Sequence, residues 1–261
     1  MTAPRPDVSL VIASYNSGAE LEETLEVVQS YLDKQPYSHE IVVVNDGSTD
    51  PTPATLERFS LRCPELRILV NGRNMGKGYS VTRGMLDTNA RFVFFTDADL
   101  AYPVETIDAF LGPLRDGTHD VVVGSRVHTG SVFHLHPRYF RYVYRRHLMS
   151  RTFNWMVRTS LGIRVMDTQC GFKGFTGEAA RAIFSRVEIH GFAFDVEVLL
   201  IADRRGFRIL ELPVTYAYGG EVSTVRIIRT ASEAAADLLR IYGRDWRGRY
   251  RTAGQGFAQR A

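Results

Sequence analysis

Two aspartates lie one residue apart directly after a strongly apolar segment. Asp97 and Asp99 follow the run 92–95, which has the composition of a strand that is covered on both faces. Carboxylate oxygens are the ligands that hard divalent cations such as Mg²⁺ and Mn²⁺ prefer. A cation held there can bind a diphosphate and neutralise the charge that develops when the diphosphate leaves. We therefore predict a metal site at Asp97 and Asp99, the alternative being a solvated tripeptide that caps the next helix.

Other polar residues follow other apolar runs of the first half. Tyr15 comes after the first run, Asp46 after the second, Lys77 in the loop after the third and Arg126 after the fifth. Ligands of open parallel sheets bind beyond the carboxyl ends of the strands, so we expect these side chains to converge. Each has a structural alternative, in which Tyr15 packs, Asp46 supports the turn at Gly47 and Lys77 is a solvated loop cation.

Two common nucleotide-binding motifs are excluded by their spacing. A dinucleotide-binding loop needs G-x-G-x-x-G after the first strand, whereas residues 14–18 contain one glycine. A P-loop needs four residues between its glycines, but Gly72 and Gly76 are separated by three, and Lys77 is followed by Gly78.

The elements that must position these residues alternate between strand and helix. This order predicts an α/β fold with a mixed, mainly parallel sheet flanked by helices. The expected strands are 8–13, 41–44, 66–70, 91–95 and 121–123, and the expected helices are 21–32, 50–59, 78–87 and 103–114.

The second half predicts a different set of elements. We expect one or two helices over 136–160, strands at 172–175, 207–211 and 214–216, helices at 177–184 and 195–203, and an amphipathic helix over 225–242. The division that follows is a single domain over 1–243 and a polar, frayed tail over 244–261.

Composition excludes several classes of protein. The 261 residues are 44% hydrophobic and 23% charged, which excludes a mainly disordered or fibrous chain. Cys63 and Cys170 are too few and too far apart for a disulfide framework or a zinc cluster. We see no apolar signal core at the N-terminus and no run of about 18 apolar residues that would span a bilayer.

One segment concentrates positive charge. Residues 121–166 contain eight arginines and no Asp or Glu, and aromatic residues are interleaved among them. Arg138, Arg141 and Arg145 are spaced i, i+3, i+7, which forms one helical stripe. A basic amphipathic helix of this kind favours an anionic membrane surface. The alternatives are a solvated arginine face and a nucleic-acid surface; we expect no nucleic acid, because that reading leaves Asp97 and Asp99 without a role.

Several motifs in order resemble those of glycosyltransferase family 2, which has the GT-A fold. The matching segments are 8–16, 42–50, 74–78, 94–103 and 124–126. Asp-Thr-Gln-Cys-Gly-Phe-Lys at 167–173 and Phe-Ala-Phe-Asp-Val-Glu at 192–197 are similar to the dolichyl-phosphate glucosyltransferase branch, with the mannose synthases as more distant relatives. The resemblance covers roughly residues 8–242.

The resemblance implies roles for the matching residues. Tyr15 and Asp46 would contact the nucleoside, Asp46 through the base, and Lys77 would lie near the nucleotide. Asp97 and Asp99 would hold the metal and the diphosphate of the donor. Three departures from the family pattern are Ala13-Ser14 in place of a proline, Ser17 in place of an acid, and Ala101 in place of a glutamine of the mannose synthases.

The acceptor side is implied in the same way. Arg126, with one or more of Arg138, Arg141 and Arg145, would hold an acceptor phosphate. Asp195 would be a catalytic base, an orienting residue or a helix cap, and these alternatives stay open. Gln169 and Lys173 would approach the sugar or phosphate.

The resemblance implies an inverting transfer of a hexose, glucose from UDP-glucose, to a polyprenyl or dolichyl phosphate, with Mg²⁺ or Mn²⁺. The alternatives are a soluble enzyme that uses Asp195 as base for a sugar hydroxyl, a GDP-mannose-dependent enzyme, and, last, a non-catalytic binding module. We expect a peripheral protein on the cytoplasmic face of a membrane, with an integral membrane partner or a second copy as further partners.

Overall fold

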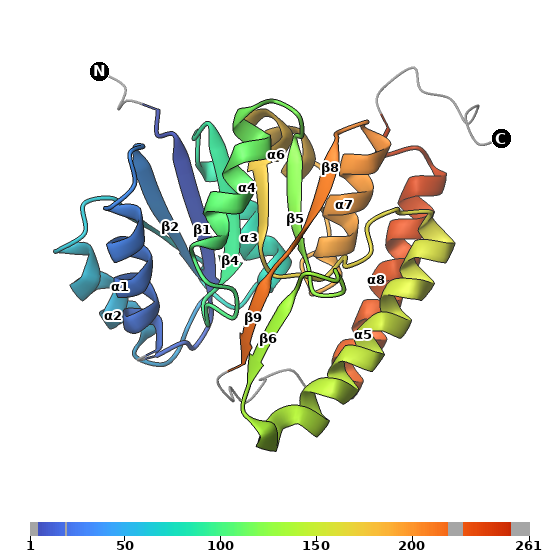
Figure 1. Cartoon of the computed structure of the whole chain (residues 1–261), viewed down its shortest axis with the longest axis horizontal. Helices are drawn as coiled ribbons and strands as arrows, with labels where there is room; N and C mark the ends of the chain where they lie inside the picture. The colour runs from blue at the N-terminus through green and yellow to red at the C-terminus, as the bar shows by residue number, and fades with distance from the viewer. Residues whose placement is uncertain (1–4, 19, 219–226, 252–261) are drawn as a thin grey trace.

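The apolar runs of the first half form neighbouring strands of one sheet. The computed structural model describes residues 5–18, 20–218 and 227–251 (Figure 1). The strands of this half are β1 (Val8–Ser14), β2 (His39–Asn45), β3 (Leu66–Val70), β4 (Phe92–Asp97) and β5 (Val121–Ser125). Each predicted strand of this half is therefore present, and no end differs from its prediction by more than two residues.

The seven-stranded sheet has the order β3-β2-β1-β4-β7-β5-β8. β8 (Ile209–Pro213) is parallel to β5, whereas β7 (Lys173–Thr176) is antiparallel to both β4 and β5. The predicted mixed, mainly parallel sheet is confirmed. The insertion of β7 between β4 and β5 brings residues 170–173 to the carboxyl end of β4.

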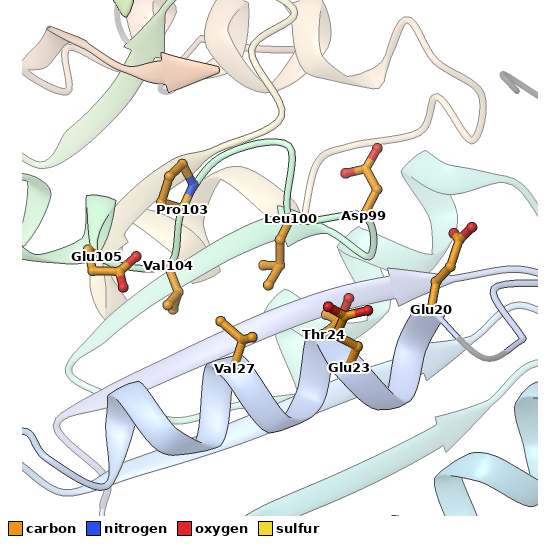
Figure 2. Close-up of a pocket in the computed structure, with 9 residues that line it drawn as sticks. All are labelled: Glu20, Glu23, Thr24, Val27, Asp99, Leu100, Pro103, Val104 and Glu105. Carbon is orange, nitrogen blue, oxygen red and sulfur yellow. The ribbon is translucent and has the colours of Figure 1, made fainter. Parts of the chain in front are cut away.

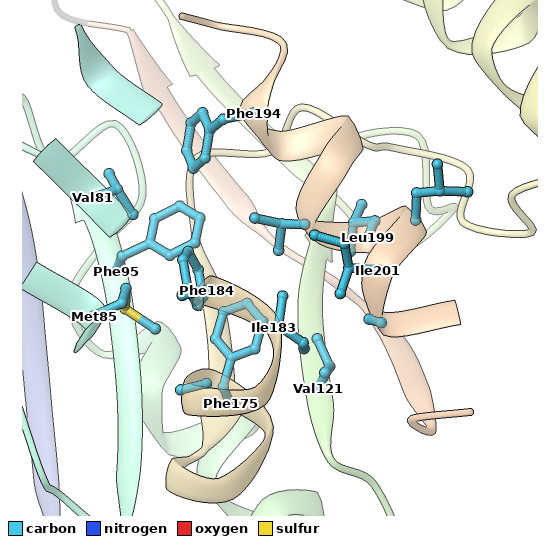
Figure 3. Close-up of a cluster of buried hydrophobic side chains, with 14 of the residues drawn as sticks. Val81, Met85, Phe95, Val121, Phe175, Ile183, Phe184, Phe194, Leu199 and Ile201 are labelled. Carbon is cyan, nitrogen blue, oxygen red and sulfur yellow. The ribbon is translucent and has the colours of Figure 1, made fainter. Parts of the chain in front are cut away.

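Helices cover both faces of the sheet and enclose two apolar cores. The helices are α1 (Glu20–Leu32), α2 (Thr52–Ser60), α3 (Lys77–Asp87), α4 (Thr106–Arg115), α6 (Gly177–Phe184) and α7 (Phe194–Arg204). Phe94 faces the core shared with α1, α2 and α4, and Phe95 faces the core shared with α3, α6 and α7 (Figure 3). This alternation follows from the strand period of two, and it directs Asp97 to the same side as Phe95.

The basic segment continues beyond the carboxyl end of the sheet. β6 (Val132–Leu135) pairs in parallel with β9 (Thr215–Tyr218), and the two extend below the sheet to a 3₁₀ turn (Pro137–Tyr139) and α5 (Phe140–Leu161) (Figure 1). The predicted helical segment is thus one long helix after a short turn, and it ends at Gly162, whose φ of 65° is left-handed. Within the described residues, no helix combines the length and the apolarity that crossing a bilayer requires.

The predicted boundary at Gly243 is wrong. α8 (Ile227–Trp246) extends past it, and Tyr250 is buried with its hydroxyl donating to Glu197 Oε1 at 2.6 Å. Arg204 also pairs with Asp245 at 2.8 Å. A buried ring with a satisfied hydroxyl fixes this segment to the core, so the fold continues to at least residue 250. Residues 225 and 226 of the predicted helix and 252–261 of the predicted tail lie outside the described residues.

Tyr250→Ala is expected to lower the free energy of unfolding by roughly 3–5 kcal/mol, because it leaves a cavity in the core and removes a donor from buried Glu197. Urea unfolding measures this. The matched control is Tyr242→Ala, since Tyr242 is exposed on α8, eight positions earlier, and its substitution should change stability by about 0.5 kcal/mol or less. Equal destabilisation by the two variants would contradict the placement of Tyr250.

Candidate active site

The predicted metal-binding residue Asp97 lies beside the predicted nucleotide-loop residue Lys77. Asp97 ends β4, and Lys77 begins α3. The Nζ atom of Lys77 is 2.5 Å from Asp97 Oδ1, and both side chains are partly exposed to solvent. Of the residues expected to converge at the strand ends, the structure thus brings Lys77 into contact with Asp97.

Asp46 binds the loop that precedes Lys77. Its carboxylate accepts hydrogen bonds from the Asn71 side chain at 2.6 Å and from the backbone N–H groups of Met75 and Gly76, each at 2.9 Å. The side chain is buried. Asp46 thus has a structural role, as one alternative predicted, but it supports the loop 71–76 and not the turn at Gly47. Contact with a nucleotide base stays a prediction.

Gly76 is required for the approach of this loop to the segment before α7. It has a φ of 97°, and a Cβ at this position would lie 2.5 Å from the carbonyl oxygen of His190. The N–H of Gly78 donates to the same oxygen at 2.8 Å. These contacts fix the first turn of α3 and therefore the position of Lys77.

Lys173 and Asp195 form a second ion pair beneath the first. Lys173 is fully buried on β7, and its Nζ atom lies 2.5 Å from Asp195 Oδ1 and 2.6 Å from the carbonyl oxygen of Cys170. Burial raises the pKa of Asp195, and the ammonium groups of Lys173 and Lys77 offset part of that increase. Lys77 is thus within electrostatic reach of both Asp97 and Asp195. The four side chains form a charged cluster of alternating sign.

Asp195 does not cap α7, although a helix cap was one of the roles considered for it. The N-cap of α7 is Ala193, which makes no side-chain cap hydrogen bond, and Asp195 lies inside the first turn with its carboxylate on Lys173. Its exposure is 4%. Lys173 is likewise an internal partner of Asp195, so its predicted approach to the sugar or phosphate has no support from its position.

Asp99 lies on the turn that follows Asp97. Its Oδ1 atom accepts a hydrogen bond from the Ala101 N–H at 3.0 Å, and Leu100 has the uncommon positive φ of 45°. The side chain is exposed and lines a cleft of about 430 Å³ between this turn and α1 (Figure 2). Glu20, Glu23 and Glu105 also line this cleft. The carboxylates on this side of the turn disfavour an anionic ligand, whereas Asp97 on the other side pairs with a cation, Lys77.

Asp97 and Asp99 fit the donor set of a Mg²⁺ or Mn²⁺ ion that is shared with a substrate. Mg²⁺ is commonly held by one or two carboxylates together with substrate phosphates. No group of three or more possible ligands occurs in the described part of the chain, so the remaining ligands must come from a diphosphate or water. Gly171 leaves room for this arrangement, because a Cβ there would collide with Asp97 Oδ2.

Gly171 was missed as a functional residue. It lies in the motif 167–173, which was used only for the resemblance. A glycine in a buried loop can mark a place where another group lies close to the backbone. The sequence does not identify that group. The structure identifies Asp97 as that neighbour.

Arg126 is held by Asp167. Its Nε and Nη2 atoms lie 2.7 Å and 2.8 Å from the two carboxylate oxygens, and its backbone N–H donates to Oδ2 at 2.9 Å. Burial alone would raise the pKa of Asp167, but the guanidinium outweighs it and lowers the pKa. Arg126 therefore joins β5 to the loop 167–171. Its contact with an acceptor phosphate stays a prediction.

Tyr15 and Gln169 are two further residues that were predicted for the site. Tyr15 is exposed at the end of β1, which excludes the alternative that it packs in the core. The adjacent Asn16 has a φ of 52° and exchanges hydrogen bonds at 2.9 Å with Ser48 and Thr49 of the loop after β2. Gln169 is half-buried, and its backbone N–H donates to Asp167 Oδ1.

β9, which pairs with the strand β6 that precedes α5, is joined to the turn that follows Asp99. The Ala217 N–H of β9 donates to the Ala101 carbonyl at 2.8 Å, and the rings of Tyr102 and Tyr216 lie 5.6 Å apart. Arg138 and Arg141 are exposed just beyond this contact. The side chain of the third predicted arginine, Arg145, lies outside the described part. The predicted acceptor arginines are therefore on a segment that is anchored to the Asp99 turn.

Comparisons with known proteins agree with this fold. The model of the family described as Glycosyl transferase family 2 matches residues 9–184. A dolichyl-phosphate beta-glucosyltransferase of Trichomonas vaginalis is 30% identical over 80% of this chain, and the human dolichyl-phosphate beta-glucosyltransferase is 30% identical over 82%. The chain spans 63% of the length of the Trichomonas relative and 68% of the human one.

Solved structures share the architecture at lower sequence identity. The glucosyl-3-phosphoglycerate synthase of Mycobacterium tuberculosis, solved with UDP, superposes with a TM-score of 0.66 at 20% identity, covering 91% of this chain and 80% of that one. A mannosyltransferase of Pyrobaculum calidifontis, solved with GDP-mannose and Mn²⁺, gives 0.57 at 20% identity, covering 91% and 65%. The match of the family model over more than half of the sequence establishes that this chain belongs to glycosyltransferase family 2.

Proposed function

We propose that this chain transfers a hexose, with inversion, from a nucleoside diphosphate sugar to a polyprenyl or dolichyl phosphate. UDP-glucose is the proposed donor. The observation that supports the proposal most strongly is the pair Asp97–Lys77 at the carboxyl end of β4, which places a carboxylate and a cation where a diphosphate would bind. The relatives named dolichyl-phosphate beta-glucosyltransferase support the choice of sugar and acceptor.

The donor would lie along the carboxyl ends of the first strands. Asp97 and Asp99 would hold Mg²⁺ or Mn²⁺, which neutralises the charge of the leaving diphosphate when bound. Lys77 adds a positive charge beside them. Tyr15 and Asp46 are the residues proposed for the nucleoside, and the exposed ring of Tyr15 suits a stacking contact.

A phosphate acceptor suits the described site better than a hydroxyl. A sugar hydroxyl needs a base to remove its proton, and the residue proposed for that task, Asp195, is 4% exposed and bound to Lys173. A phosphate monoester has a second pKa near 6 and is largely ionised at neutral pH, so it needs no base. Catalysis would then depend on orientation and charge stabilisation.

The acceptor phosphate would be held by arginines near the Asp99 turn. Arg138 and Arg141 are exposed and suit this task directly. Arg126 would contribute only the part of its guanidinium that Asp167 leaves accessible. Arg145 and Gln169 complete the proposed set. The alternatives of a GDP-mannose donor, a hydroxyl acceptor and a non-catalytic binding module are outcomes of the experiment below.

We further propose that α5 lies on the cytoplasmic face of a membrane. Phe140, Tyr144, Leu148 and Trp155 are exposed along α5 at spacings that place them near one helical stripe. Arg141 and Arg151 are exposed on the same helix. Apolar side chains that insert and arginines that meet anionic lipid are the two attractions that hold an interfacial helix. An integral membrane partner or a second copy of the chain stays a prediction.

The purified protein is expected to transfer glucose from UDP-glucose to a polyprenyl phosphate in detergent with Mn²⁺, measured as labelled lipid product. GDP-mannose and a water-soluble sugar acceptor form the comparison arms. Asp97→Asn should lower turnover by about 100-fold or more, because one electrostatic contact to the leaving group is lost.

Two glycine variants sharpen this test. Gly171→Ala should lower turnover strongly, because its Cβ displaces Asp97, whereas Gly112→Ala on α4 meets no neighbour within 4 Å and should leave turnover unchanged. Transfer to the soluble sugar but not to the lipid would contradict the proposed acceptor. Full turnover by Asp97→Asn would contradict the proposed metal site.

The membrane proposal predicts that the protein sediments with vesicles that contain anionic lipid, and less so in high salt. The double substitution Phe140→Ser and Leu148→Ser should lower the partition coefficient by about tenfold or more, since it removes two exposed apolar anchors. Leu61→Ser is the matched control, because Leu61 is exposed at the end of α2. Equal sedimentation of the double variant and the wild type would contradict the proposal.

A further inference from the structure

Lys77 pairs with one carboxylate oxygen of Asp97, the residue proposed to hold the divalent cation. The Nζ atom lies 2.5 Å from Asp97 Oδ1, so the two groups form an ion pair in direct contact. A metal ion that binds Asp97 through the same oxygen must displace this ammonium group. Both side chains are partly exposed, at 22% and 32%, so an ion from solvent can reach them.

A second carboxylate, that of Asp195, also attracts the ammonium group of Lys77. Asp195 interacts electrostatically with Lys77 and already holds the buried ammonium of Lys173. Asp97, Asp99 and Asp195 together bring three negative charges against the two positive charges of Lys77 and Lys173. A divalent ion that binds alone would reverse the sign of the cluster, whereas an ion that binds with a diphosphate would leave it negative. The charge balance therefore favours joint binding.

We propose that Lys77 is a place-holder for the metal: it neutralises Asp97 in the donor-free protein and moves to the diphosphate when the donor and the metal bind together. This inference rests on the proposed function and deepens it. The contacts of Gly76 and Gly78 with residue 190 fix the backbone next to Lys77. The four-carbon side chain of a lysine has several rotatable bonds, so its ammonium group can move while the backbone stays in place.

The place-holder makes the binding of metal and nucleotide cooperative. Nucleotide draws Lys77 away from Asp97 and so raises the affinity for the ion. By linkage, the ion raises the affinity for nucleotide by the same factor. Without Lys77 the ion meets an unpaired carboxylate, so its affinity in the absence of nucleotide should rise and the coupling should fall.

The experiment measures Mn²⁺ binding by electron paramagnetic resonance of the free ion, with and without saturating UDP. The wild type should bind Mn²⁺ weakly alone and about tenfold more tightly with UDP, which is an ordinary coupling between two sites. Lys77→Met should bind Mn²⁺ alone about tenfold more tightly than the wild type and gain less from UDP than the wild type does, because only the direct contact of the diphosphate with the ion remains. Lys77→Arg, which keeps the charge, should bind Mn²⁺ alone as weakly as the wild type.

Lys34→Met is the control, because Lys34 is exposed just after α1 and its ammonium group donates to the Ser30 hydroxyl; this variant should match the wild type in both conditions. Circular dichroism establishes that each variant is folded, and Lys77→Gln replaces Lys77→Met if the latter does not fold. Unchanged or weaker Mn²⁺ binding by the charge-removing variant would overturn the place-holder.

Asp97→Asn separates this inference from the proposed metal site. Loss of Mn²⁺ binding in this variant, together with no gain in Lys77→Met, overturns the place-holder and leaves the metal site standing. Wild-type Mn²⁺ binding by Asp97→Asn overturns the metal site itself, and with it the place-holder.

Discussion

The site depends on how charges are balanced at the end of an apolar strand. β4 is buried up to Thr96, and the chain then places a carboxylate, Asp97, at the edge of that core. A carboxylate in such a place needs a partner, because an unpaired charge at a low-dielectric boundary is costly. Lys77 is that partner in the structure, and Asp195 and Lys173 continue the alternation inward. The same requirement that stabilises the fold thus assembles the residues that we propose bind a diphosphate and its metal.

The supports of this cluster come from distant parts of the chain. Asp46 of the loop after β2 fixes the loop before α3, and Glu197 of α7 accepts the backbone N–H groups of Glu188 and Ile189 at 2.8 Å and 2.7 Å. The segment that follows residue 189 contacts Gly76 and Gly78. Tyr250 binds Glu197 from the C-terminal side. A continuous set of contacts therefore runs from the end of α8 to the loop that positions Lys77.

The sequence predicts the sheet well where strands are buried on both faces, since runs such as 41–44 and 92–95 have no other stable placement. It fails for β6, whose residues are mostly exposed and lack alternation, and periodicity does not reveal that β7 runs antiparallel. The tail was misjudged because Tyr250 stands among polar residues, and its burial depends on a partner 53 positions away. Composition near the chain end does not report such a partner.

The candidate site was predicted in outline but not in its pairings. The positions after the strands predicted that Asp97 and Lys77 would lie together. The resemblance added Asp195 and assigned Arg126 to the acceptor phosphate, and the structure pairs Arg126 with Asp167. Local patterns identify residues at the edge of a sheet, and they do not show which opposite charges the fold brings into contact. Gly171 illustrates the limit, because its importance arises only from the carboxylate that lies against it.

The most direct measurement is the anomalous scattering of manganese from crystals grown with Mn²⁺ and UDP-glucose. The account predicts a manganese peak in contact with both Asp97 and Asp99, with the diphosphate as a further ligand and the Lys77 ammonium on the diphosphate. A manganese peak at any other place, or a nucleotide bound while Lys77 stays on Asp97, would contradict it.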